Sequence, residues 1–167
     1  MIIVLNGPLG IGKSTLAEVL TESIDGCVML DGDRLIAANP PYDDAYEHLH
    51  ATIALLVAHH YRYGYRHFVL DYIWRSTAEL DDLRHHLLLL DDDIRCFLLT
   101  LPEEENLKRI EQRASVRAIN ELAFERQIFA QEREILATSS GLNCEPFDVS
   151  AAPEVLVKTM LQRLGLS

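Results

Sequence analysis

Basic residues are scarce in this sequence. Its 167 residues include 15 Lys and Arg against 26 Asp and Glu, which gives a formal net charge of -11. A surface of that sign repels nucleic acid and anionic membranes unless a local basic patch intervenes. Hydrophobic residues make up 49% and charged residues 25%, as in ordinary globular proteins. The composition therefore argues against a nucleic-acid substrate, while a mononucleotide stays open.

Long apolar runs are also lacking. No stretch approaches the roughly 20 residues that span a bilayer, and no charged leader precedes the first apolar run, so we expect neither a membrane span nor a signal peptide. No internal repeat or linker divides the chain. We expect one domain over residues 1–167, as a monomer or dimer in the cytoplasm.

Cysteine is rare, and no C-x-x-C spacing occurs. The three residues, Cys27, Cys96 and Cys144, lie far apart. An odd number at scattered positions predicts reduced thiols, and the apolar neighbours of Cys27 and Cys96 predict small core residues. Six of the seven histidines occur in close pairs on expected helices (His48 and His50, His59 and His60, His85 and His86). Neighbouring helix positions do not converge on one point, so packed or solvated histidines are expected rather than a zinc site.

The start of the chain carries the most informative motif. Residues 1–6 form a continuous apolar run, typical of a strand buried on both faces of a parallel sheet. The next residues fit G-x-x-x-x-G-K-[ST], and an apolar-periodic helix follows. In this motif the loop amides surround phosphate oxygens, the lysine reaches the β- and γ-phosphates, and the serine hydroxyl binds Mg²⁺. The motif predicts a nucleoside triphosphate site formed by Gly7, Pro8, Leu9, Gly10, Ile11, Gly12, Lys13, Ser14 and Thr15.

Further apolar runs alternate with helical periodicity. Strands are expected at 27–30, 67–71, 94–99 and 147–149, and helices at 13–24, 34–38, 44–63, 76–90, 100–111, 121–137 and 153–164. Ser76 and Glu79 form a predicted capping box, and residues 91–93 are expected to be a solvated turn. This alternation predicts an α/β fold, a five-stranded parallel sheet with helices on both faces. Ligands of such sheets bind at the carboxyl ends of the strands.

Three acidic residues are expected at those ends. Asp33 is the candidate general base for an acceptor hydroxyl, and Asp31 is expected to position it or to hold a metal-bound water. The alternative for Asp33 is a cap of the helix at 34–38. Asp71 ends its expected strand. It is expected to hold the Mg²⁺ shell, and the alternative is a carboxylate that merely terminates the strand. Trp74 and Arg75 follow it, as substrate contacts or as packing over the strand end.

The densest basic run lies between 109 and 126. Arg113 and Arg117 are predicted to belong to a lid, around 112–120, that brings a guanidinium to the γ-phosphate. For Arg109 the alternative of helix-surface ion pairing is stronger. Nearby acids suggest such surface pairing in general, namely Glu105, Glu111, Glu121, Glu125 and Glu132.

Together these motifs resemble the small P-loop kinases, a group that includes shikimate kinase, gluconate kinase, adenylylsulfate kinase, the zeta toxins and chloramphenicol phosphotransferase. The run Asp33-Arg34-Leu35-Ile36 with Asn39-Pro40 is similar to the region of chloramphenicol phosphotransferase that begins with its catalytic Asp. The resemblance implies the three-layer P-loop fold with strand order 2-3-1-4-5, ATP with Mg²⁺, and a lid. It also implies that the loop at 140–153 lies against the adenine.

The sequence thus predicts an ATP-dependent, Mg²⁺-dependent phosphotransferase that acts on a hydroxyl of a small molecule. Lys13, Asp33, Arg113 and Arg117 are the expected catalytic residues; Asp31, Asp33, Arg34 and Arg75 are expected at the acceptor, and Ser14, Asp31 and Asp71 at the metal. One alternative is a nucleotide-dependent switch that signals through a protein partner. A polynucleotide kinase is a second alternative, which the net charge disfavours.

Overall fold

The protein is described by a computed structural model, which covers residues 1–115, 121–138 and 142–166. In this part of the chain, five strands form one parallel sheet in the order β2-β3-β1-β4-β5. The strands are β1 (Ile2–Asn6), β2 (Cys27–Asp31), β3 (His67–Asp71), β4 (Ile94–Thr100) and β5 (Glu145–Asp148). The helices are α1 (Lys13–Ser23), α2 (Gly32–Leu35), α3 (Ala45–Arg62), α4 (Thr77–Leu87), α5 (Glu103–Ser115), α6 (Leu122–Thr138) and α7 (Pro153–Leu164).

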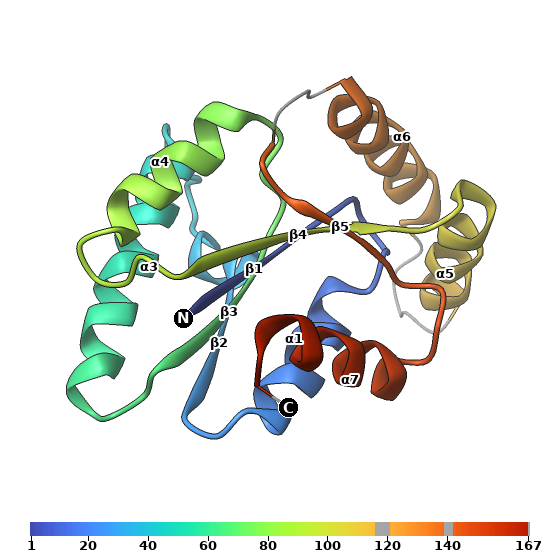
Figure 1. The fold of residues 1–167 in the computed structure, drawn as a ribbon. Coiled ribbons are helices and arrows are strands. Elements are labelled where there is room, and N and C mark those ends of the chain that lie inside the picture. The colour runs from blue at the N-terminus through green and yellow to red at the C-terminus, as the bar shows by residue number, and fades with distance from the viewer. Residues whose placement is uncertain (116–120, 139–141, 167) are drawn as a thin grey trace.

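Helices cover both faces of the sheet (Figure 1). One core lies between the sheet and the pair α1 and α7, and a second lies between the sheet and the pair α3 and α4. The strand β1 is buried along its whole length between β3 and β4. Helices α5 and α6 lie side by side beyond the carboxyl end of β4. The predicted α/β class and strand order are therefore confirmed.

Side-chain caps set the starts of three helices, α2, α3 and α4. Ser76 accepts a hydrogen bond from the Glu79 backbone nitrogen, and the Glu79 carboxylate accepts one from the Ser76 nitrogen, so the predicted capping box is confirmed. Asp44 caps α3 through the Glu47 nitrogen. The cap of α2 is Asp31, whose side chain accepts from the Arg34 nitrogen. Capping is therefore not the role of Asp33.

Two expectations about segment bounds were wrong. Helix α5 continues through Ser115, so the first part of the predicted lid is helical, while 116–120 lie outside the described residues. The edge strand β5 begins at Glu145 and includes Pro146, which an edge tolerates because one side of the strand needs no ladder hydrogen bonds. Along the described ranges, none of the helices has both the length and the apolar character needed to cross a bilayer.

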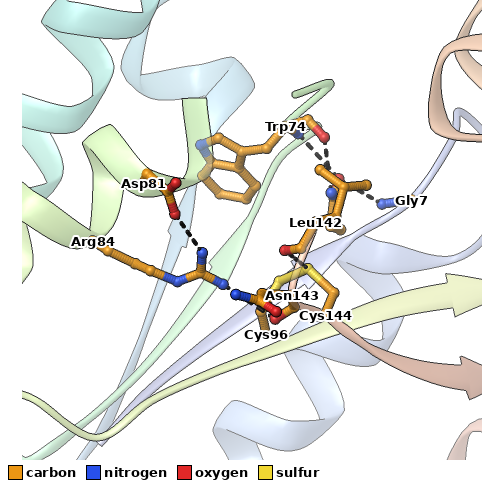
Figure 2. The surroundings of a disulfide bond; sticks show 9 residues. Gly7, Trp74, Asp81, Arg84, Cys96, Leu142, Asn143 and Cys144 are labelled. Atoms are coloured by element: carbon orange, nitrogen blue, oxygen red, sulfur yellow. Dashed lines mark hydrogen bonds and ion pairs between the residues drawn. A yellow bond between two sulfur atoms is a disulfide. The ribbon is translucent and has the colours of Figure 1, made fainter. Parts of the chain in front are cut away.

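The cysteine prediction is corrected by a disulfide between Cys96 and Cys144, which lie 48 positions apart with Cα atoms at 4.6 Å (Figure 2). The register of the parallel pair explains it: Phe97 of β4 lies opposite Glu145 of β5, so the two preceding residues are lateral neighbours. Cys96 is buried as predicted, and Cys27 is a free thiol.

The acidic turn at 91–93 is more than a solvated turn. The Asp91 carboxylate pairs with the N-terminal ammonium of Met1 and accepts a hydrogen bond from the Tyr61 hydroxyl at 2.5 Å. These partners hold the pKa of Asp91 below its usual value, against the effect of burial. The turn therefore anchors the amino end of β1. This is the opposite end of the strands from the acidic residues Asp31, Asp33 and Asp71.

Candidate active site

The phosphate-binding motif forms the loop between β1 and α1. Gly10 and Gly12 have φ angles of 73° and 105°, which L side chains rarely adopt. A Cβ atom on Gly10 would also lie 2.4 Å from Cγ1 of Ile110 in α5. Glycine at this position therefore serves both the turn of the loop and the close approach of α5.

Lys13 lies at the first turn of α1, with its ammonium folded back over the loop. Its Nζ donates to the carbonyl oxygens of Gly7 at 2.9 Å and Pro8 at 3.3 Å. Burial lowers the pKa of Lys13, and the carboxylates of Asp71, Glu132 and Asp33 oppose that shift. Three acids from three segments of the chain thus surround the ammonium of the loop lysine.

Side chains of helix α5 hydrogen-bond to the backbone of the phosphate loop. Asn106, fully buried, donates from Nδ2 to the Leu9 carbonyl at 3.0 Å. Arg109 donates from Nη1 to the Ile11 carbonyl at 2.8 Å and from Nη2 to the Val149 carbonyl at 2.7 Å. The surface-pairing alternative for Arg109 is therefore wrong, since its guanidinium joins the phosphate loop to the segment after β5.

A cleft runs along the loop from the strand-end acids to the segment after β5. The predicted nucleotide residues from Leu9 to Thr15 line it, whereas Gly7 and Pro8 are not among its lining residues. The remaining lining residues are Leu16, Asp33, Asp71, Arg109, Gln112, Arg113, Val149, Ala151, Pro153 and Leu156. The cleft thus has a polar end at the carboxyl ends of β2 and β3 and a more apolar end between α5 and α7.

Asp71 is the last residue of β3 and is 4% exposed. Burial raises the pKa of its carboxyl group, while Lys13 and a hydrogen bond with the Ser14 hydroxyl lower it. Hydroxyl and carboxylate oxygens are the donors that Mg²⁺ prefers. The pair Ser14 and Asp71 therefore fits a magnesium ion beside the phosphate loop.

Asp33 projects from α2 into the same cleft. Gly32 permits this turn, because a Cβ there would lie 2.6 Å from Cδ2 of Tyr72. Among the described residues, no side chain hydrogen-bonds or ion-pairs with Asp33. Burial raises the pKa of the Asp33 carboxyl group, Asp31 raises it further, and Lys13 and Arg75 oppose the shift. Within the described ranges, the arrangement thus presents a carboxylate without a fixed partner beside the loop lysine.

Asp31 and Arg34 are used within their own turn. The Asp31 carboxylate accepts from the Arg34 nitrogen at 3.3 Å and pairs with Arg34 Nε at 3.1 Å. The Arg34 side chain is otherwise exposed. Both oxygens of Asp31 thus have partners, so this residue acts on the cleft mainly through its charge on Asp33.

Arg75 lies between α3 and α6. Its Nη1 donates to the Tyr46 hydroxyl at 3.0 Å, and its Nη2 lies 3.6 Å from Oε1 of Glu132. Its backbone nitrogen donates to the Glu79 carboxylate at 2.5 Å, which fixes the start of α4. Trp74 is fully buried, so the suggestion that it grips a substrate is wrong.

Helix α6 supplies two functional candidates that the sequence did not reveal. Glu132, 7% exposed, accepts a hydrogen bond from the Leu9 nitrogen of the phosphate loop at 2.7 Å. Glu125, 5% exposed, pairs with Nη2 of Arg113 at 2.7 Å. The expected surface pairing is wrong for both acids, but it does describe Arg126 with Glu111. The predicted lid residue Arg117 lies outside the described residues.

The comparisons with known proteins agree with this geometry. The profile of the AAA_33 family, described as an AAA domain, matches residues 2–135. No curated protein matches the sequence at a significant level. Among solved structures, a gluconokinase from Sinorhizobium meliloti superposes with a TM-score of 0.69 at 21% identity, over 97% of this chain and 91% of that one.

Two further structures are similar over nearly their whole length. The tunicamycin resistance protein of Deinococcus radiodurans has a TM-score of 0.65 at 19% identity, covering 99% of this chain and 96% of its own. A sugar kinase from a Janibacter species has a TM-score of 0.71 at 16% identity, and the match covers 99% of this chain and 95% of that one. The predicted resemblance to small P-loop kinases is confirmed at the level of the fold. By the match over most of its length, the chain belongs to the AAA_33 family of AAA domains.

Proposed function

We propose that this protein transfers the γ-phosphoryl group of ATP to a hydroxyl of a small molecule, with Asp33 as general base. The observation that carries the proposal is that Asp33 lines the same cleft as the phosphate loop and has no fixed partner in the described residues. A nucleotide switch needs no such carboxylate beside the γ-phosphate position. The cleft therefore favours the phosphotransferase over the switch.

On the donor side, the loop amides from Leu9 to Thr15 and the α1 amino terminus bind the phosphates of ATP. The Lys13 ammonium leaves the Gly7 and Pro8 carbonyls to contact the β- and γ-phosphates. Ser14 and Asp71 would hold a magnesium ion, which would supply positive charge to offset the charge of the phosphates. The apolar end of the cleft, at Val149 and Pro153, receives the adenine.

On the acceptor side, the Asp33 carboxylate accepts the proton of the attacking hydroxyl as the new O–P bond forms. Its raised pKa makes it a stronger base than an ordinary aspartate. We assign Arg75, whose charge lowers the pKa of Asp33, and Arg34 to the binding of the acceptor. Arg113, held by Glu125, contributes positive charge at the transferred phosphoryl, and we extend this role to Arg117.

The test is a product-mass assay with MgATP and a panel of small hydroxylated acceptors. One acceptor should gain a phosphate, and Asp33→Asn should lower transfer by at least about a hundredfold while ATP affinity stays within about threefold. The control is Asp25→Asn, which removes an exposed carboxylate in the turn before β2. Wild-type transfer rates in Asp33→Asn would refute the general base. Tight ATP binding with no acceptor across the panel would instead favour the switch.

A further inference from the structure

A buried chain of hydrogen bonds begins at the phosphate loop. Asn6, fully buried at the end of β1, accepts from the nitrogens of Gly7 at 2.9 Å and Trp74 at 3.0 Å through one oxygen. Its Nδ2 donates to the Trp74 carbonyl at 2.8 Å. Asn6 therefore fixes the entrance of the loop and the backbone just before Arg75 with a single side chain.

The chain continues from the Trp74 indole into α3 and α4. Trp74 Nε1 donates to Nε2 of His50 at 3.0 Å, and His50 Nδ1 lies 2.6 Å from Oδ2 of Asp82. An indole N–H only donates, so Nε2 of His50 must be the unprotonated nitrogen. The imidazole is then neutral, with its proton on Nδ1 and donated to Asp82. Both Trp74 and His50 are fully buried.

A metal ion is the first alternative for this cluster, because ligand atoms of His50, Asp82 and His86 lie within 4.8 Å of one another. The tautomer argues against it. A metal-bound histidine donates its other N–H to an acceptor, but the other nitrogen of His50 faces the N–H of Trp74. Metal on Nδ1 would leave an imidazolate with no proton on either nitrogen. The cluster is therefore a hydrogen-bonded relay rather than a metal site.

We propose that His50 and Trp74 are positioning residues of the transferase site, which hold Asn6 and thereby set the phosphate loop against the Arg75 backbone. This inference rests on the proposed function for its kinetic readout. Every link is 3.0 Å or shorter, from Asp82 to Gly7. A shift of about 1 Å between donor and acceptor groups costs up to about a hundredfold in rate. Losing the relay should therefore act on kcat, because the phosphate-binding amides themselves remain.

Two substitutions of His50 test separately the two hydrogen bonds that its imidazole makes, one with Trp74 and one with Asp82. In His50→Gln the side-chain amide reaches the position of Nε2 and still accepts from Trp74, while the Asp82 bond is lost. In His50→Asn the amide reaches only the position of Nδ1, so the Asp82 bond stays and the Trp74 bond is lost. We expect His50→Asn to lower kcat about tenfold with KM for ATP within about threefold. His50→Gln should stay within about threefold of wild type in both.

A second readout needs no acceptor. The chain has one tryptophan, so its fluorescence emission reports on the indole of Trp74 alone. MgATP should shift this emission in wild type and in His50→Gln, because the loop entrance and the indole backbone share Asn6. The shift should be absent in His50→Asn. His60→Asn, on the same helix outside the relay, serves as the control and should respond as wild type does.

The inference is overturned if His50→Asn and His50→Gln behave alike in kcat and emission shift, or if wild type shows no shift with MgATP. Should His50→Asn fail to fold in a urea titration, Trp74→Phe, which removes the indole N–H together with one ring of the indole, must fold and show the same loss of kcat. Because the emission arm uses MgATP alone, a protein that phosphorylates no acceptor would refute the proposed function and leave this test intact.

Discussion

The Glu132 carboxylate accepts a hydrogen bond from the Leu9 backbone nitrogen at 2.7 Å, across 123 positions of sequence. Leu9 lies in the phosphate loop, where backbone N–H groups serve anionic ligands. Its other backbone group, the carbonyl, accepts from Asn106. The loop is therefore held on both sides by helices of the α5–α6 pair.

Replacing Glu132 should separate its two roles. Glu132→Ala leaves the Leu9 N–H without its partner in a buried position and should lower the free energy of unfolding by about 1–3 kcal/mol. Glu132→Gln keeps an acceptor oxygen and loses the charge toward Arg75 and Lys13, so its loss of stability should be smaller. Urea denaturation without nucleotide measures both, with exposed Glu134→Ala as the matched control on α6. Equal losses in the Ala and Gln variants would contradict the hydrogen-bonding role.

Arg109 should act on nucleotide binding rather than on transfer. Arg109→Ala removes donors to the Ile11 and Val149 carbonyls, and a loss of about 1.4 kcal/mol corresponds to about a tenfold rise in KM for ATP. The lysine of Arg109→Lys can donate to only one of the two carbonyls, so its KM for ATP should lie between those of wild type and Arg109→Ala. Steady-state kinetics with varied ATP gives the values. Lys108→Ala, on the exposed face of α5, should have the KM for ATP of wild type. An unchanged KM in Arg109→Ala would argue against a role of the Arg109 hydrogen bonds in nucleotide binding.

The pH dependence of transfer should follow Asp33. Burial and then Asp31 raise the pKa of this carboxyl group above its ordinary value of 3.8. A general base works only when ionised, so kcat/KM should rise with pH through this raised pKa and level off above it. Asp31→Asn removes one cause of the shift and should move the rising limb to lower pH. A pH–rate profile measures this, and a limb that moves upward would refute the assigned sign.

The disulfide gives a prediction that is independent of catalysis. The denatured protein should titrate one thiol before reduction, from Cys27, and three after it. Cys144→Ser, or reduction of the wild type, should lower the free energy of unfolding by about 2–4 kcal/mol, because the bond closes a long loop in the unfolded chain. Cys27→Ser should change little. Titration of three thiols without reductant would show that the bond does not form.

The sequence was informative wherever the signal is local. The phosphate loop, the parallel sheet with helices on both faces and the capping box at Ser76 each depend on residues within one turn or on alternating runs, and the structure has them as expected. The strand order was implied by the resemblance to small P-loop kinases, and it too is as expected. Asp71 was predictable because it directly ends an apolar run. In each case the physical cause lies within a few positions of the residue concerned.

The contacts that were missed are long-range. Glu125 and Glu132 follow helix spacing like any surface acid, and only the packing of α6 against the loop makes them buried partners. Cys96 and Cys144 meet through strand register rather than through a motif. His50 and His86 converge from different helices, which spacing within one helix cannot reveal.

The hydrogen bond from Arg109 to the Val149 carbonyl joins the part of the chain that matches the family to the part that follows it. The family match ends at residue 135, and Val149 lies after it, in the segment between β5 and α7. The wall at the apolar end of the cleft is therefore supplied by chain outside the matched range. Exchanging residues 145–164 for those of a related protein should alter the preference for the nucleobase, while the recognition of phosphate, encoded in the first fifteen residues, is inherited unchanged.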